Sequence, residues 1–233
     1  MAKDVIVALD FPGRTEALGF LDLFESEKPY VKIGMELFYR EGPDMVKEIT
    51  MRGHRVFLDL KLHDIPNTVA GAVRSLGQLD VDMINLHAGG GIQMMQAAAG
   101  ALDAFSHRRP LLIAVTVLTS LDESLLTREL LISQPLEETV LHYAQNAKIA
   151  GLDGVVCSPL EAKGVHDALG RGFVTVTPGI RFADARKGDQ QRVSTPAEAR
   201  VLGSDYIVVG RPVTQAEDPV EAYRRCVSDF VNP

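Results

Sequence analysis

The residues with the clearest capacity for chemistry lie in the segment Phe57–Thr68, where two aspartates flank one lysine. Side chains alternate along a strand, so Asp59 and Lys61 share one face while the leucines beside them point to the other. A buried charge is unfavourable unless it is paired, and an Asp–Lys ion pair would be an ordinary structural feature. Asp64 adds a second carboxylate and leaves excess negative charge, which favours a reactive or ligand-binding array.

The elements that must position these residues follow a repeated order. Eight short apolar runs are each followed by polar or glycine residues and then by a helical pattern. The runs are Val5–Leu9, Tyr30–Ile33, Val56–Leu60, Met83–Leu86, Leu111–Val117, Gly154–Val156, Val174–Val176 and Tyr206–Val209. Strands that alternate with helices indicate βαβ units and a parallel sheet. Eight units in 233 residues predict a single α/β domain, a (β/α)8 TIM barrel, over residues 1–233.

Local signals support the helices between these strands. Ser158, Thr195 and Asp218 each precede a proline and lie three residues before a glutamate, a pattern typical of a capped helix start. Apolar residues recur at three- and four-residue spacing in Leu136–Ala150, which predicts a buried helical face. We expect the insertion Thr119–Pro135 at the barrel mouth, either as a lid or as a plain surface loop.

Polar side chains follow most of the predicted strands. In a parallel barrel, catalytic residues gather at the C-terminal ends of the strands and in the loops that follow. The residues at those positions are Asp10, Lys32, Asp59, Lys61, His87, Thr119, Ser158, Arg181 and Arg211. Such a set favours an anionic ligand that carries hydroxyl groups.

Composition narrows the range of partners. The net charge is −7, from 24 Lys and Arg against 31 Asp and Glu, whereas a nucleic-acid surface needs clustered positive charge. The apolar run Val5–Leu9 is too short for a signal peptide or a membrane span. Cys157 and Cys226 do not make a disulfide framework. We therefore expect a cytoplasmic protein with no nucleic-acid partner and no membrane partner.

Several other motifs are weaker. The six histidines lack the spacing of zinc motifs, and neither cysteine belongs to a Cys-x-x-Cys pair, so we expect no metal and no cofactor. The segment His87–Gly91 is glycine-rich but lacks the further glycine of a dinucleotide fingerprint. We interpret it as a turn, with His87 as a structural residue.

The segment Asp59-x-Lys61-x-x-Asp64-Ile65-x-x-Thr68 resembles the signature of the orotidine 5′-phosphate decarboxylase family, and the resemblance covers essentially the whole chain. Further segments that resemble the family in the same order are Val7–Asp10, Val31–Gly34, Val115–Ser120, Val176–Arg181, Gly188–Gln190 and Ile207–Pro212. The resemblance implies a cofactor-free barrel enzyme that converts orotidine 5′-monophosphate to UMP and CO2.

The resemblance also implies the roles of the charged segment. Asp59, Lys61 and Asp64 would surround C6 of the pyrimidine, where the carboxylate leaves, and Lys61 would supply the proton that replaces it. The family resemblance implies a homodimer in which Asp64, Ile65 and Thr68 reach the site of the second subunit.

For the phosphate group, the resemblance implies binding by Arg211, the Gly210 backbone and Gln190, with Arg181 closing over it. Arginine suits phosphate because its planar guanidinium donates two parallel hydrogen bonds. Loops after the seventh and eighth strands are also where barrels of this kind frequently bind phosphate.

For the rest of the nucleotide, the resemblance assigns four further residues. Asp10 and Lys32 would bind the ribose hydroxyls, and Lys32 would also be linked to the charged array. Thr119 would contact the pyrimidine edge, and Pro178 would pack near the ring.

Two other functions remain possible from the sequence. Barrels of the ketogulonate- or hexulose-phosphate type also carry Asp-x-Lys-x-x-Asp but resemble Mg²⁺-dependent enzymes with a carboxylate at the end of the second strand. Lys32 ends that strand here and would repel a divalent cation. A non-catalytic nucleotide sensor would need the phosphate and ribose contacts but not a lysine between two carboxylates.

Overall fold

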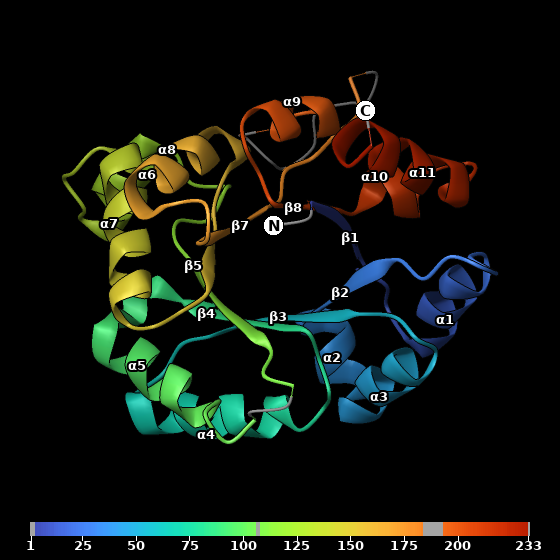
Figure 1. Ribbon diagram of the computed structural model, residues 1–233, viewed down its shortest axis with the longest axis horizontal. Coiled ribbons are helices and arrows are strands. Elements are labelled where there is room, and N and C mark those ends of the chain that lie inside the picture. The colour runs from blue at the N-terminus through green and yellow to red at the C-terminus, as the bar shows by residue number, and fades with distance from the viewer. Residues whose placement is uncertain (1–2, 106–107, 184–192, 233) are drawn as a thin grey trace.

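The computed structural model describes residues 3–105, 108–183 and 193–232. Eight parallel strands pair in sequence order and close into a barrel, and β1 pairs with β8 through Val7 and Val209. The strands are β1 (Asp4–Ala8), β2 (Tyr30–Gly34), β3 (Val56–Leu62), β4 (Met83–His87), β5 (Leu111–Val115), β6 (Gly154–Val156), β7 (Val174–Thr177) and β8 (Tyr206–Val209). Figure 1 shows this order around the ring. The predicted (β/α)8 barrel is confirmed, and predicted strand ends differ by at most two residues.

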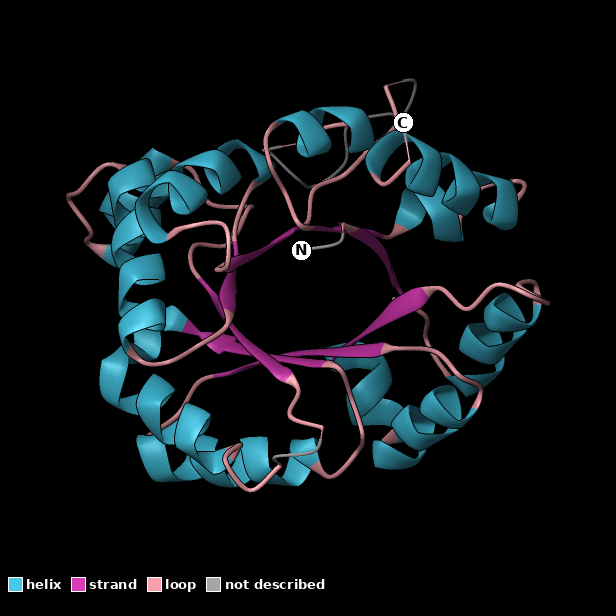
Figure 2. Cartoon of the chain, in the orientation of Figure 1, coloured by secondary structure: helices cyan, strands magenta, loops and turns pink. Residues whose placement is uncertain are grey.

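Helices surround the strands as an outer ring (Figure 2). In the described residues they are α1 (Arg14–Asp22), α2 (Met35–Glu41), α3 (Pro43–Met51), α4 (Pro66–Gly77), η1 (Ala88–Gly90), α5 (Gly91–Ala101), α6 (Glu123–Leu130), α7 (Leu136–Ile149), α8 (Pro159–Leu169), α9 (Pro196–Val201), α10 (Arg211–Thr214) and α11 (Pro219–Phe230). In the described residues, no helix is both long enough and apolar enough to cross a membrane.

The predicted helix starts are present. Ser158 and Thr195 form full capping boxes at α8 and α9, in which the side chain of the third helical residue bonds back to the cap. Asp218 caps α11 by accepting a hydrogen bond from the Glu221 N–H. The insertion after β5 contains the short helix α6, whose Leu126 is fully buried.

Alternation along the strands divides the apolar core into two layers. Leu58 and Leu60 of β3 pack in the layer between strands and helices. Phe57, on the opposite face, packs inside the barrel in one cluster with Ile6 of β1 and Met83 of β4. The predicted division of β3 into two faces is therefore confirmed, and the interior is filled by side chains rather than open.

Strands β6 and β7 approach one another closely at Gly154. A Cβ atom added there would lie 2.2 Å from the backbone oxygen of Val174. We expect Gly154→Ala to lower the free energy of unfolding by about 1–3 kcal/mol, because the two strands would have to separate. Urea unfolding measures this change.

The matched control is Gly100→Ala in α5, where an added Cβ meets nothing within 4 Å. We expect the free energy of unfolding of this variant to rise by about 0.5–1 kcal/mol, because alanine is more favourable than glycine inside a helix. Equal stability of Gly154→Ala and the wild type would contradict the close approach.

Candidate active site

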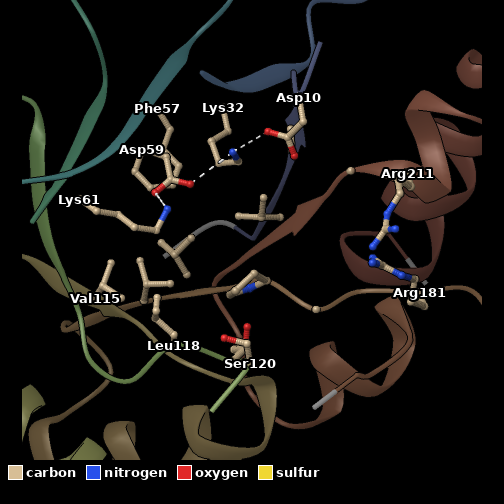
Figure 3. A pocket seen from close by; sticks show the side chains of 18 of the residues that line it. Asp10, Lys32, Phe57, Asp59, Lys61, Val115, Leu118, Ser120, Arg181 and Arg211 are labelled. Carbon is tan, nitrogen blue, oxygen red and sulfur yellow. Dashed lines mark hydrogen bonds and ion pairs between the residues drawn. The ribbon is translucent and has the colours of Figure 1, made fainter. Parts of the chain in front are cut away.

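A cavity of about 500 Å³ opens at the C-terminal end of the barrel strands. Its lining combines an apolar floor with charged side chains (Figure 3). The apolar lining residues are Ala8, Phe57, Val115, Val117, Leu118, Val156, Val176, Pro178 and Val208. The charged ones are Asp10, Lys32, Asp59, Lys61, Arg181 and Arg211. The strand-end residues predicted from sequence therefore include the main charged groups of one cavity.

Four of these charges form an alternating chain across β1, β2 and β3. Lys32 Nζ lies 3.1 Å from Asp10 Oδ1 and 3.3 Å from Asp59 Oδ2. Lys61 Nζ donates to Asp59 Oδ1 at 2.6 Å. Figure 3 shows these contacts as dashed lines along one wall of the cavity. The aspartate and lysine of β3 are thus brought together as expected, and Lys32 joins them to Asp10.

Burial alone would raise the pKa of Asp59, but the positive charges of Lys32 and Lys61 outweigh it, helped by hydrogen bonds from Lys61 and Asn85. The pKa of Asp59 therefore lies below its ordinary value. Burial would likewise lower the pKa of Lys32, but Asp59 and Asp10 outweigh it and raise that pKa. Both groups are charged at neutral pH, so the cavity wall presents fixed charges.

The end of β3 departs from regular strand geometry. Between the paired residues Leu58 and Leu62, β3 advances four residues while β4 advances two. Lys61 lies inside this bulge with a φ of 51°. This is the left-handed backbone region, which residues other than glycine rarely adopt. Bulges and left-handed residues concentrate at functional sites, where they re-aim a side chain.

The side chain that accompanies this bulge was not predicted from the sequence. Asn85 Nδ2 donates to Asp59 Oδ1 at 2.6 Å, and Asn85 Oδ1 accepts from the Lys61 N–H at 2.8 Å. Asn85 is fully buried in β4. Its one sequence signal is an amide inside the apolar run Met83–Leu86.

Two arginines occupy a different side of the cavity from the aspartate–lysine chain. Arg211 begins α10 directly after Gly210, and Arg181 follows β7 and donates to the Ile180 carbonyl at 2.7 Å. Figure 3 shows their guanidinium groups turned toward one another. Gly210 lines the same cavity, and so does Gln215, which the sequence analysis missed.

Thr119 and Pro178, which the resemblance places near the base, also line the cavity. Gln190 lies outside the described residues. The structure thus places the predicted phosphate and base residues around one cavity wherever it describes them, while their contacts with a nucleotide stay predictions.

Three predicted residues lie away from the cavity of their own chain. Asp64, Ile65 and Thr68 follow β3 and begin α4, and all three are exposed. Asp64 Oδ1 accepts a hydrogen bond from the Ile65 N–H at 2.6 Å, and 68% of the surface of Ile65 is exposed to solvent. Within one chain, the second carboxylate of the predicted array therefore does not contact Lys61.

Comparison with known proteins identifies the family of this chain. The Orotidine 5′-phosphate decarboxylase / HUMPS family model matches residues 3–226. The chain belongs to this family.

Orotidine 5′-phosphate decarboxylases of Bacillus species are among the relatives of this chain. Those of Bacillus cereus (strain Q1) and Bacillus anthracis (strain A0248) are each 55% identical over 227 residues, or 96% of this chain and 95% of the relative.

Solved structures of related barrels superpose closely. A crystal structure of orotidine 5′-phosphate decarboxylase from Lactobacillus acidophilus has a TM-score of 0.87 at 42% identity, covering 98% of this chain and 99% of that one. An uncharacterized conserved protein from Geobacillus kaustophilus also has a TM-score of 0.87, at 50% identity, covering 97% of this chain and 99% of that one.

The side chain of Lys32 in β2 bears on the metal-dependent alternative. Lys32 places an ammonium between the carboxylates of Asp10 and Asp59, where a divalent cation would need open carboxylate oxygens. In the described part of the chain, no three His, Cys, Asp or Glu side chains are grouped to hold a metal ion.

We expect Lys32→Met to lower the free energy of unfolding by about 1–3 kcal/mol at pH 7, because the buried Asp59 carboxylate keeps Lys61 but loses its second ammonium partner. Lys32 helps to hold the pKa of Asp59 below its unfolded value. That stabilisation is present above the unfolded aspartate pKa and is lost as pH falls through the folded pKa. The difference between wild type and variant should therefore narrow below about pH 4 in urea unfolding.

The control is Lys47→Met, which removes an exposed ion pair with Asp44 at 3.4 Å. We expect a change within about 0.5 kcal/mol for such a surface pair. A Lys32→Met variant as stable as this control would contradict the role of the buried ammonium.

Proposed function

We propose that the chain decarboxylates orotidine 5′-monophosphate to UMP and CO2, the last step of UMP synthesis. The observation that carries the proposal is the 2.6 Å contact of the Lys61 ammonium with Asp59, on the wall of a cavity that also holds two arginines. The family and its relatives named orotidine 5′-phosphate decarboxylase support the same reaction.

The reaction breaks the bond between C6 and the carboxylate carbon, and its electron pair stays on C6 as CO2 leaves. A substrate carboxylate beside ionised Asp59 is repelled, and the repulsion disappears as neutral CO2 forms. Lys61 stabilises negative charge that develops at C6. Interactions that are stronger in the transition state than in the ground state accelerate the step.

The proton that replaces CO2 comes from the Lys61 ammonium. This transfer leaves a neutral amine on Lys61 and a C–H bond at C6, so charge and protons balance without a metal or cofactor. Lys32 then maintains the positive charge next to Asp59. Asp59, Lys61 and Lys32 are therefore the catalytic residues that we assign within one chain.

We assign the phosphate to Arg211, the Gly210 backbone and Arg181, together with Gln190. Arginine donates paired hydrogen bonds to phosphate oxygens, and a phosphate held far from C6 anchors the substrate. Asp10 and Lys32, at the opposite wall, would bind the ribose hydroxyls.

Thr119 and Pro178 complete the proposed substrate contacts. Both line the cavity after β5 and β7, where Thr119 would contact the pyrimidine edge and Pro178 its ring.

We further propose that the enzyme is a homodimer in the cytoplasm and that Asp64 acts in the site of the second subunit, with Ile65 and Thr68. The exposure of these three residues supports this, because it leaves their side chains accessible to a second chain. Asp64 from the second subunit would supply the other carboxylate beside Lys61.

We expect the purified protein to consume orotidine 5′-monophosphate at the same rate with and without EDTA, followed by absorbance. Lys61→Ala is expected to abolish turnover, consistent with losses of about 10²–10⁴-fold when an acid–base group is removed. The variant should still bind UMP, because the phosphate contacts remain.

The matched control is Lys163→Ala, an exposed lysine of α8 that should leave the rate unchanged. No turnover in either wild-type sample would contradict the proposed reaction, and turnover only with Mg²⁺ would contradict the metal-free site. A near-normal rate for Lys61→Ala would show that another group donates the proton.

Mixing tests the shared site. Lys61→Ala and Asp64→Ala homodimers should each be inactive, but a mixed dimer restores one site that holds both side chains. Equal amounts after full subunit exchange should recover about one quarter of the wild-type activity, since half of the dimers are mixed. No recovery despite demonstrated exchange would place both residues in the same chain's site.

A further inference from the structure

The buried amide of Asn85 is the polar group next to the charged chain that the proposed mechanism does not use. We propose that Asn85 is a positioning residue that fixes the Asp59 carboxylate and the Lys61 backbone together, an inference that rests on the proposed function. Asn85 is fully buried and lies behind the cavity wall, so it acts through these two residues rather than on the substrate.

The geometry uses both ends of the amide. Asn85 Nδ2 donates to Asp59 Oδ1 at 2.6 Å, and Asn85 Oδ1 accepts from the Lys61 N–H at 2.8 Å. Rotating the amide by half a turn would bring its oxygen against the carboxylate and its NH2 group against the N–H. Both contacts would be repulsive, so only one orientation is compatible with the site.

The Lys61 backbone needs such a partner. The bulge interrupts the ladder between Leu58 and Leu62. A buried N–H left without an acceptor costs about 1–3 kcal/mol. Asn85 Oδ1 satisfies the N–H of Lys61 and holds the residue at φ of 51°, from which its ammonium reaches Asp59.

The carboxylate of Asp59 needs a donor that does not react. Its Oδ1 accepts from Lys61 Nζ and from Asn85 Nδ2, both at 2.6 Å, while Oδ2 lies 3.3 Å from Lys32 Nζ. When Lys61 gives up its proton, the Asn85 bond remains on Oδ1. Asn85 therefore keeps the carboxylate oriented throughout the reaction.

Another buried polar side chain of the barrel, Thr175, forms its hydrogen bonds away from the charged chain. Thr175 of β7 is fully buried, but its hydroxyl bonds to Asp205 at 3.0 Å in the layer next to α8. Thr175 therefore provides a control for the loss of a buried hydrogen bond outside the cavity wall.

The test compares Asn85→Leu, which is similar in size but cannot hydrogen-bond, with the wild type. We expect kcat to fall by up to about 100-fold, as for a misplaced reacting group, while KM changes by less than about threefold. Loss of the donor should raise the pKa of Asp59, so the acid limb of the kcat profile should move to higher pH. The other ionisable groups that face Asp59 are Lys32, Lys61 and His87, and Asp10 adjoins Asp59 through Lys32.

Two further variants make the result decisive. Asn85→Asp keeps an acceptor for the Lys61 N–H but places a second carboxylate at Asp59, so it should move the acid limb further than Asn85→Leu. It also serves as the test if Asn85→Leu does not fold. Thr175→Val should lower the melting temperature without moving the acid limb.

A folded Asn85 variant with wild-type kcat and an unmoved acid limb would overturn the positioning role, as would an equal shift of that limb in Thr175→Val. Titration of the Asp59 carboxylate by ¹³C NMR separates this inference from the proposed function. A wild type that does not turn over the substrate overturns the function. A carboxylate titration unchanged by Asn85→Asp overturns the role of Asn85.

Discussion

The buried ammonium of Lys32 is the interaction around which this end of the barrel is organised. It lies between the exposed Asp10 and the largely buried Asp59, and neither Lys32 nor Asp59 could be buried at low cost alone. Asp10 follows β1, and Lys32 and Asp59 lie within β2 and β3, so the three residues meet only when these strands pair in the observed register. Pairing of these three strands therefore also assembles the charged chain.

Along β3, the side chains that face the barrel interior change from apolar packing residues to charged residues of the site. Phe57 packs with the apolar interior, and Asp59, two residues later on the same face, belongs to the charged chain. The regular part of β3 ends at this boundary, and the left-handed Lys61 follows. A well-packed interior can hold a strained residue in place because it limits how far the strand can relax.

Sequence patterns predict the barrel well because alternation and helix capping are local signals. The faces of β3 follow from alternation, and capping predicts the starts of α8 and α9. The bulge at Lys61 and its bond to Asn85 do not follow, because they depend on how β3 and β4 pair. A lone asparagine in an apolar run gives no sign of its partner. The proposed role of Asp64 concerns a second chain and depends on the residue motif alone.

The alternating chain has a further consequence for how the cavity responds to salt. Two carboxylates and two ammonium groups in the order Asp10, Lys32, Asp59 and Lys61 sum to no net charge, so their field decays quickly with distance. Arg181 and Arg211 add positive charge at another side of the cavity. Ionic strength should therefore weaken the long-range attraction of an anionic ligand mainly through the arginines, while the compact chain keeps its short-range contacts.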